Sequence, residues 1–350
     1  MPAAFIRKEQ DERMSPAVRE GDQLNIGFIG AGKVGCSLGK YFADGGLQVK
    51  GYYSRTSEKT QEAARFTDSE VFADEKSLTD ACDVIFLTVP DGRITSVWND
   101  LKRFELNGKL ICHCSGAMSS RDAFPGIEKT GAFGYSIHPL FAVSDRFNAY
   151  RELTDVFFTL EGGERGTGGK PCAGAATGGG QDTAEALRSM DGSRIGADQN
   201  AAEQEAADRK VEALMKTLGN PYQWIDASHK TTYHCAAAMA SNLVCGLIDQ
   251  SIELMQRCGF AEEAAVKALA PILMGNMAHI AADGPTASLT GPIERNDVQT
   301  VVKHLNCLEN EAEQELYTVL SQRLVQMAQR RHTDRDYAGM SQLLRKEKEK

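Results

Sequence analysis

Polar side chains that could exchange a proton with a substrate follow two predicted strands of this 350-residue chain. Ser115 lies just after the predicted strand 108–113, and His138 just after the predicted strand 133–137. A serine hydroxyl can donate to a carbonyl oxygen or a carboxylate, and a histidine can supply a proton near neutral pH. Because the carboxyl ends of parallel strands meet at one edge of a sheet, Ser115 and His138 are candidate catalytic residues. A helix-capping role for Ser115 and a hydrogen-bonded loop role for His138 remain the alternatives.

A second group of polar side chains lies in an alanine-rich stretch of helical periodicity, residues 228–257. As one straight helix, about 30 residues would extend over ~45 Å. Helical spacing puts four polar residues on one face of this helix: Lys230, His234, Ser241 and Asn242. Polar groups among small, closely packed residues are either satisfied core pairs or the wall of a substrate site. We predict catalytic roles for His234 and Asn242 and substrate binding by Lys230 and Ser241, although Lys230 could instead extend into solvent.

The loop 288–297 adds a cationic group to these candidates. Arg295 could bind a substrate carboxylate with both arms of its guanidinium. Asn296 or Asp297 is expected to cap the helix that follows. We therefore predict that Arg295 binds a small carboxylate substrate.

A glycine loop near the start of the chain favours dinucleotide binding. It follows the apolar stretch 24–29 and precedes a predicted helix, which is the context that a G-x-G-x-x-G motif requires. The first glycine makes the tight turn, the second lets a pyrophosphate approach the backbone, and the third packs the helix on the strand. Val89 and Pro90, at the end of the predicted strand 83–89, are expected to line the same groove. The loop residues are Gly30, Ala31, Gly32, Lys33, Val34 and Gly35.

The end of the next predicted strand, 47–53, indicates which dinucleotide is bound. A site for NAD would place an acidic residue there to bind the ribose 2′-hydroxyl. This chain has Ser54, Arg55 and Thr56 instead. An arginine offers a planar, permanently charged fork for a 2′-phosphate, so we expect NADP as cofactor. An ordinary polar turn with relaxed specificity is the alternative.

Predicted strands alternate with helices in the first half of the chain, which indicates a parallel sheet covered on both faces. The strands are expected at 24–29, 47–53, 83–89, 108–113, 133–137 and 155–160. The fold class we expect is α/β, a Rossmann-type parallel sheet domain followed by an all-helical C-terminal domain. Residues 297–331 could form one long helix at the end of the second domain.

The glycine-rich segment 162–205 separates the two domains and contains few large apolar residues. Such a segment buries too little surface to offset its ordering entropy, so we predict a flexible insertion, with a functional lid as the alternative. The expected organisation is a polar tail 1–22, a Rossmann NADP-binding domain 23–161, the insertion 162–205, a helical substrate and dimerisation domain 206–333, and a charged tail 334–350.

The composition excludes several classes of partner. A formal net charge of −9 without a basic face disfavours nucleic acid. No stretch approaches the ~20 uninterrupted apolar residues of a membrane span, and the first residues lack the pattern of a signal peptide. The nine cysteines include no C-x-x-C pair, so we expect reduced thiols in a cytoplasmic protein rather than disulfides or a metal site.

These motifs together resemble a family of Rossmann-like NADP oxidoreductases whose C-terminal helical domain is known as a domain of unknown function. The matching stretches are 26–38, 113–118, 136–146, 156–162, 229–242 and 289–297. The wider superfamily is similar to 6-phosphogluconate dehydrogenase, pyrroline-5-carboxylate reductase and ketopantoate reductase. In many β-hydroxyacid dehydrogenases of this superfamily a catalytic lysine is followed four residues later by asparagine, whereas here Lys230 is followed by His234. The insertion 162–205 is also longer than the usual linker.

The resemblance and the residues together predict an NADP-dependent oxidoreductase that transfers a hydride to the carbonyl of a small 2-oxo acid, as ketopantoate (2-dehydropantoate) reductases do. His234 or His138 would protonate the nascent oxygen, and Asn242, Ser115 and Arg295 would orient the substrate. One alternative is an imine reductase that resembles pyrroline-5-carboxylate reductase. Another is a redox sensor that binds NADP without turnover. The long helix of small residues also favours a homodimer.

Overall fold

The computed structural model describes residues 23–163 and 193–345 of the chain. The predicted polar tail 1–22, residues 164–192 of the predicted insertion and residues 346–350 lie outside the described residues. The Cα positions divide the chain into two compact units, Met1–Ala238 and Met239–Lys350. The two candidate histidines, His138 and His234, therefore both belong to the first unit.

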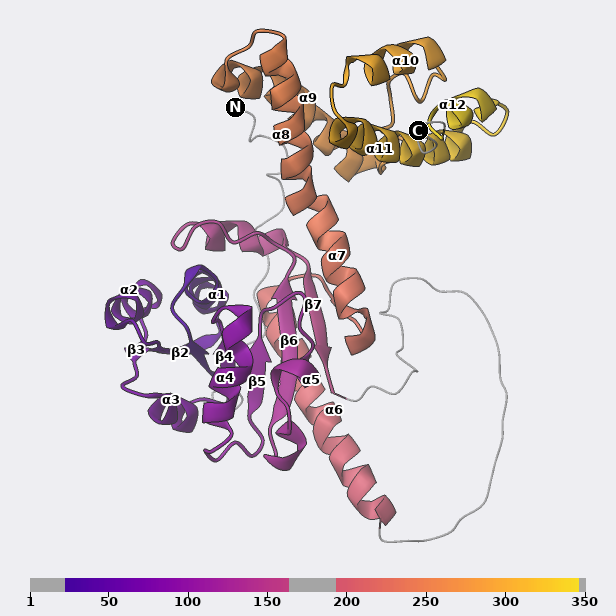
Figure 1. The fold of residues 1–350 in the computed structure, drawn as a ribbon. Coiled ribbons are helices and arrows are strands. Elements are labelled where there is room, and N and C mark those ends of the chain that lie inside the picture. Colours follow the sequence, from indigo (N-terminus) through magenta and orange to yellow (C-terminus); the bar gives the residue numbers. More distant parts are fainter. Residues whose placement is uncertain (1–22, 164–192, 346–350) are drawn as a thin grey trace, which may run out of the picture. The chain divides into compact units, whose positions relative to one another are not determined.

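The first unit is built on an eight-stranded sheet with the strand order β3-β2-β1-β4-β5-β6-β7-β8 (Figure 1). Neighbouring strands from β3 to β6 are parallel, β7 is antiparallel to β6, and β8 is parallel to β7. The order of the parallel part is that of a Rossmann fold, which confirms the predicted fold class. The strands are β1 (Asn25–Ile29), β2 (Gln48–Tyr53), β3 (Glu70–Val71), β4 (Val84–Leu87), β5 (Leu110–His113), β6 (Phe133–Pro139), β7 (Phe158–Gly162) and β8 (Tyr222–Trp224).

Two strands were not expected, and a third begins later than predicted. β3 and β8 have two and three residues, too few for a period of two to be visible in the sequence. The strand predicted at 155–160 begins only at Phe158, because Ala149–Asp155 forms a 3₁₀ helix.

Helices cover both faces of this sheet (Figure 1). They are α1 (Lys33–Asp44), α2 (Ser57–Thr67), α3 (Glu75–Ala81), α4 (Asp91–Leu101), α5 (Ser120–Ala123) and α6 (Ser193–Leu218). Successive side chains of a strand point to opposite faces. Accordingly, Phe86 packs into the core beneath α1, α2 and α6, whereas its neighbour Ile85 packs into the core beneath α3, α4 and α5. Burial on both faces explains why these strands read as unbroken apolar runs.

Helix α6 takes in the last residues of the segment that the sequence predicts as a flexible insertion. It begins at Ser193, so residues 193–205 are helical. Alanine, glutamate and glutamine are frequent in this part and favour a helix. Further along α6, Val211 and Met215 are fully buried in the core of the sheet, at helical spacing. This anchors the described part of α6 to the first unit.

The second unit is entirely helical in the part of the chain that the structure describes. Its helices are α8 (Asn242–Arg257), α9 (Glu262–Asp283), α10 (Val298–Cys307), α11 (Glu311–Arg331) and α12 (Ala338–Leu343). Val301 of α10 and Val325 of α11 lie in one buried apolar cluster with Leu289 and Ile293 of the preceding loop. α9 ends at Asp283, just before Gly284 and Pro285, and α10 begins at Val298 after its cap, Asp297.

The predicted single helix 228–257 is wrong in one respect, because it is interrupted at Ser241. α7 (Lys230–Ala240) ends there, and α8 begins at Asn242. Ser241 has φ −123° and ψ −77°, outside the helical region. Serine and asparagine compete for local backbone hydrogen bonds and favour helix ends, which explains the break. The argument that put Lys230, His234, Ser241 and Asn242 on one continuous face therefore fails.

The expected long helix 297–331 is also interrupted, between Cys307 and Glu311. Asn310 caps α11, and its side chain accepts a hydrogen bond from the backbone N–H of Glu313 at 3.0 Å. Glu313 in turn accepts a hydrogen bond from the backbone N–H of Glu309 at 3.0 Å. This reciprocal cap is readable in the sequence as asparagine followed three residues later by glutamate.

Part of the predicted charged tail 334–350 is packed rather than solvated. Tyr337 and Met340 are 1% and 0% exposed and lie in the same cluster as Val301. Leu344, one turn further on, is also buried. The helical spacing of these apolar residues outweighs the charges that follow them.

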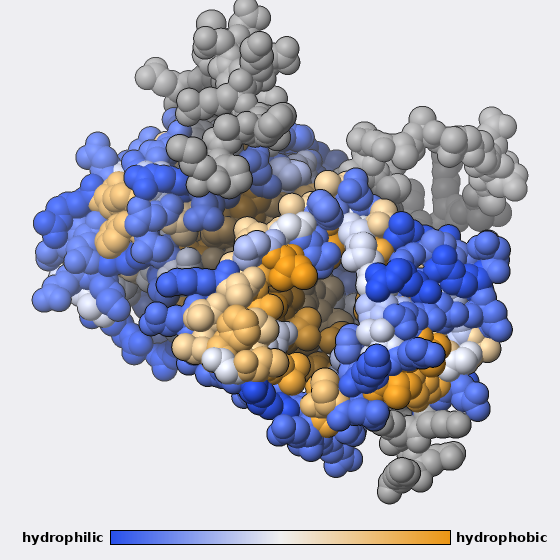
Figure 2. All heavy atoms as spheres, turned by 90° about the horizontal axis from the view of Figure 1, so that it is seen from above, coloured by the Kyte–Doolittle hydropathy of each residue, from blue (hydrophilic) through white to orange (hydrophobic). Residues whose placement is uncertain are grey.

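Many apolar side chains of α8 and α9 are exposed, among them Leu243 (62%), Ile272 (71%) and Met274 (68%). Figure 2 shows hydrophobic residues gathered on the face that it presents. Within the part of the chain that the structure describes, two helical stretches are long and apolar enough to cross a membrane, Ala227–Arg257 and Glu262–Asp283. Extended apolar surface of this kind is typical of contact with another protein or with a membrane.

Candidate functional site

The glycine loop connects β1 to α1 and leaves space at its middle glycine. A Cβ atom on Gly30 would lie 2.6 Å from the carbonyl oxygen of Thr88, and one on Gly35 would overlap the carbonyl oxygen of Gly30. A Cβ atom on Gly32 would have no neighbour within 4 Å. Gly32 is also the N-cap of α1, whose first turn contains no acidic residue. The outer glycines are thus required by packing, and the middle one leaves a positively polarised helix end open to an anion.

The turn after β2 carries the residues predicted to bind the ribose. The hydroxyl of Ser54 lies 2.6 Å from that of Thr60 and thereby ties the turn to α2. Thr56 is the N-cap of α2. Arg55 is exposed and forms no ion pair among the described residues. Its guanidinium is therefore available to a ligand.

The end of β4 lies beside the end of β1, because Leu87 pairs with Ile29 in the sheet. Val89 is half-buried and Pro90 exposed just beyond this point. Both therefore lie at the carboxyl edge next to the glycine loop, where open α/β sheets bind their ligands.

Both candidate histidines converge on Gly116, in the loop after β5. A Cβ atom on Gly116 would lie 2.8 Å from Cδ2 of His234 and 2.9 Å from Nε2 of His138. His138 comes from β6 and His234 from α7, so the two imidazoles reach this point from separate elements. His138 is half-buried and His234 exposed. The structure thus brings together two residues that the sequence could only name separately.

The surroundings of His138 keep its imidazole neutral. Nδ1 lies 2.7 Å from the hydroxyl of Tyr233, and the two rings meet edge to face. Burial lowers the pKa of His138 to about 4, and the charges of Lys230 and His234 act in the same direction. At pH 7 His138 can therefore donate or accept a hydrogen bond as a neutral ring, but it holds no positive charge.

Lys230, at the start of α7, points into the protein and not into solvent. Its side chain is buried, and Nζ donates to Oγ of Ser136 at 2.7 Å and to the carbonyl oxygen of Ser115 at 3.0 Å. Burial lowers the pKa of Lys230 to about 8, against the opposing effect of Glu161. Lys230 thus ties α7 to the ends of β5 and β6 and brings a buried cation close to His138.

The hydroxyl of Ser115 is engaged within its own turn. It donates to Oδ2 of Asp91 at 2.7 Å and accepts from the backbone N–H groups of Met118 at 3.1 Å and Ala117 at 3.3 Å. Its single hydrogen is therefore used by Asp91. Ser115 does not cap a helix, because the next helix, α5, begins at Ser120 and is capped by Ser119. Its hydrogen bonds instead hold a turn and link the start of α4 to the loop that contains Gly116.

Three residues of this cluster were not identified from the sequence. Tyr233 contacts His138, while Glu161 is 3% exposed and accepts hydrogen bonds from the backbone N–H and hydroxyl of Ser120 at 2.7 and 2.8 Å. Burial raises the pKa of Glu161. Thr159 is 4% exposed, pairs with His138 in the sheet, and makes no hydrogen bond through Oγ1 among the described residues. A signal for Tyr233 was available, since it lies one turn after Lys230 on the predicted helix.

The remaining predicted site residues belong to the second unit. Ser241 and Asn242 lie at the break before α8. Arg295 is exposed in the loop before α10. Asp297 is the N-cap of α10, and its carboxylate accepts from the backbone N–H of Thr300 at 3.0 Å. The predicted capping role of Asp297 is thus confirmed.

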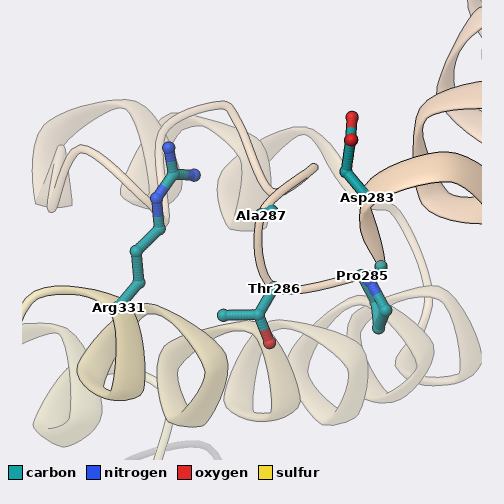
Figure 3. A pocket seen from close by; sticks show the side chains of 6 residues that line it. Asp283, Pro285, Thr286, Ala287 and Arg331 are labelled. Atoms are coloured by element: carbon teal, nitrogen blue, oxygen red, sulfur yellow. The ribbon is translucent and has the colours of Figure 1, made fainter.

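An open pocket of the second unit contains none of the predicted site residues. It has a volume of about 500 Å³ and lies between the turn after α9 and α11 (Figure 3). The guanidinium of Arg331 there donates to the carbonyl oxygen of Leu289 at 2.7 Å, which holds the loop to α11. The pocket is lined by Asp283, Gly284, Pro285, Thr286, Ala287 and Arg331. Among the described residues, no three histidine, cysteine or acidic side chains come together as a metal site.

Comparison with known families separates the chain into the same two kinds of domain. Residues 9–139 match the Rossmann-like domain. Residues 200–324 match the domain of unknown function DUF2520. No curated protein matches the chain. The match of residues 200–324 begins within α6, which packs on the sheet of the first unit.

Solved structures share this fold over nearly their whole length. The Thermotoga maritima protein TM1727 is 23% identical, with a TM-score of 0.62 over 88% of this chain and 99% of its own. BF3122 of Bacteroides fragilis, named a candidate NADP oxidoreductase, is 17% identical, with a TM-score of 0.58 over 87% and 98%. The NADPH-bound reductive aminase of Aspergillus terreus is 12% identical, with a TM-score of 0.51 over 93% of each chain. At these identities the likeness is one of fold.

Proposed function

We propose that this chain is an NADP-dependent oxidoreductase that transfers a hydride to the carbonyl carbon of a small 2-oxo acid. The observation that carries the proposal is the convergence of His138 and His234 on Gly116. This point follows β5, whose carboxyl end lies at the same sheet edge as the glycine loop after β1, because β1, β4 and β5 are parallel neighbours. A proton-donating group and a dinucleotide loop at one edge are what a hydride-transfer site needs.

The residues present fit NADP. The open space at Gly32 and the N-terminus of α1 suit a pyrophosphate, and the exposed Arg55 suits a 2′-phosphate. Gly30, Ala31, Lys33, Val34 and Gly35 would complete the loop, with Ser54, Thr56, Val89 and Pro90 around it. When bound, NADPH would supply a hydride, which carries both electrons that the reduction requires.

The two histidines take different roles in this proposal. The neutral His138 donates a hydrogen bond that holds and polarises the substrate oxygen. The exposed His234 supplies the proton that converts this oxygen to a hydroxyl, and it is reprotonated from solvent. The buried ammonium of Lys230 favours the negative charge that develops on the oxygen, and so contributes from beneath the site rather than by binding substrate directly.

The substrate class rests on the resemblance to ketopantoate reductases. Asn242, Ser241 and Arg295 stay predictions for binding the substrate carboxylate. An imine substrate is the second candidate, favoured by the names of two structural relatives, the reductive aminase and a Plasmodium falciparum pyrroline carboxylate reductase with NADP bound (13% identical, TM-score 0.50, covering 87% of this chain and 95% of that one).

The experiment that tests this function measures NADPH oxidation by the purified chain with a series of small 2-oxo acids and cyclic imines. NADPH affinity is measured in parallel by cofactor fluorescence. Turnover of a 2-oxo acid supports the proposal, whereas turnover of imines alone supports the second candidate. Tight NADPH binding without turnover of any substrate would instead favour the redox sensor.

We also propose that the chain forms a homodimer in the cytoplasm. The exposed apolar side chains of α8 and α9, such as Leu243 and Ile272, need a cover, and a second copy of the chain offers the same surface. Light scattering of the purified chain without detergent should give twice the mass of 38.1 kDa. A monomer that sediments with lipid vesicles would contradict this proposal and favour a membrane.

A further inference from the structure

The hydrogen bond between His138 and Tyr233 decides which ring nitrogen of His138 carries the hydrogen. A neutral histidine carries its hydrogen on one ring nitrogen, and the partner of the other nitrogen decides which. Nδ1 of His138 lies 2.7 Å from the hydroxyl of Tyr233. That distance is usual when an O–H donates, whereas N–H donors usually lie at about 2.9–3.0 Å from oxygen. An imidazole nitrogen is also a better acceptor than a phenol oxygen, so Tyr233 is the donor.

The position of Tyr233 favours the same direction. Burial raises the pKa of Tyr233, so its phenol keeps its hydrogen at neutral pH. That single hydrogen is available to Nδ1 of His138, which lies 2.7 Å away.

The consequence appears at the other nitrogen. With Nδ1 accepting, Nε2 carries the hydrogen, and Nε2 is the atom that faces Gly116. Lys230 supports the neutral form of His138. Its Nζ lies 5.8 Å from the centre of the Tyr233 ring, and its charge disfavours a second proton on His138. The site therefore presents a fixed hydrogen-bond donor at the point where the two histidines meet.

We infer that Tyr233 is a positioning residue that fixes His138 as its Nε2–H tautomer, so that the site accepts a substrate whose reacting group is a hydrogen-bond acceptor, a carbonyl oxygen. A protonated imine nitrogen carries its own hydrogen and would oppose this donor. The inference rests on the proposed hydride transfer, and it favours the carbonyl substrate over the second candidate, the imine. His138 keeps its proton throughout, since losing it would leave an imidazolate anion, and the proton for the product comes from His234.

The direct test is nitrogen NMR of the histidine-labelled chain without substrate, with His138 identified by its absence in His138→Gln. We expect Nε2 protonated and Nδ1 bare in the wild type, and a mixture of both tautomers in Tyr233→Phe. Thr232→Ala is the matched control, because Thr232 is exposed beside Tyr233 on the same helix. A wild-type His138 that carries its hydrogen on Nδ1 overturns the inference whatever the enzyme reduces.

The second measurement compares turnover of a 2-oxo acid with that of a cyclic imine carboxylate of equal carbon number. We expect the wild type to prefer the 2-oxo acid, and Tyr233→Phe to lower its kcat roughly tenfold with unchanged NADPH affinity, as for loss of one hydrogen bond. Preference for the imine would overturn the substrate assignment while leaving hydride transfer intact. NADPH binding without turnover of either compound would reject the proposed function, and the NMR result would still decide the role of Tyr233.

Discussion

The ammonium of Lys230 on α7 donates to the hydroxyl of Ser136 on β6 at a distance of 2.7 Å. This bond joins α7 to the edge of the sheet at which the candidate site lies. Lys230 is buried, and its hydrogen bonds to Ser136 and to the carbonyl oxygen of Ser115 offset part of the free-energy cost of removing its charge from water. The position of His234, one turn further along α7, depends on this anchor.

Replacing Lys230 by methionine should therefore disturb both stability and the state of His138. Ser136 and the Ser115 carbonyl lose a donor, so we expect a lower melting temperature. Because the Lys230 charge helps to lower the pKa of His138, that pKa should rise in Lys230→Met. Thermal unfolding and an NMR titration of His138 measure the two effects. An unchanged His138 titration would show that the two groups do not interact.

Acid should destabilise the folded chain through His138 and His113. The pKa of His138 is lowered to about 4 and that of His113 to about 3, from an ordinary value of 6.5, mainly by burial. The unfolded state then binds more protons than the folded state below pH 6.5, so stability is lost as pH falls from 6.5 towards 4. Denaturant unfolding at several pH values measures the slope. His138→Gln should flatten it, and an equal slope in that variant would contradict the assignment.

An alanine at Gly116 should block the site without affecting the cofactor. Its Cβ atom would lie 2.8 Å from Cδ2 of His234 and 2.9 Å from Nε2 of His138, so both contacts are too close and the imidazoles must move. Displacements of this size can lower turnover by roughly 10²-fold. NADPH affinity should stay unchanged. Gly92→Ala is the control, since a Cβ atom there would meet nothing within 4 Å. Full turnover of Gly116→Ala would remove both histidines from the reaction.

Two changes test the cofactor loop separately. Gly32→Val adds a side chain where no atom lies within 4 Å, so it should lower NADPH affinity without lowering the melting temperature. Arg55→Ala should weaken NADPH binding more than NADH binding, because only NADPH carries the 2′-phosphate. Dissociation constants for both cofactors measure these effects. If Arg55→Ala keeps its preference for NADPH over NADH, a group other than Arg55 binds the 2′-phosphate.

His234→Ala should lower turnover far more than NADPH affinity. As a general acid, His234 would contribute about 10²- to 10⁴-fold. Single-turnover kinetics with saturating NADPH measure the loss. If His234 has only a structural role, the variant will be less stable but its folded fraction will show near-normal turnover. Solvent would then supply the proton that converts the substrate oxygen to a hydroxyl.

The sequence by itself determined the parts of this protein that depend on neighbours along the chain. The glycine loop is readable because strand, turn and helix N-terminus are consecutive, and the alternation of apolar strands and helices specifies a parallel sheet. The cap at Asp297 is readable for the same reason. The breaks at Ser241 and Asn310 had local signals as well, but helical periodicity on either side concealed them.

Only the tertiary structure decided which of the polar candidates meet. His138 and His234 converge on Gly116 because β6 lies beside β5 and because Lys230 anchors α7 to their ends. The contact of Tyr233 with His138 depends on the same packing. Periodicity along one segment carries no information about such pairings, since they are set by sheet register and by the burial of side chains from distant segments. The sequence could therefore name the two histidines and Lys230, but not Tyr233 or the contacts among these side chains that set their chemistry.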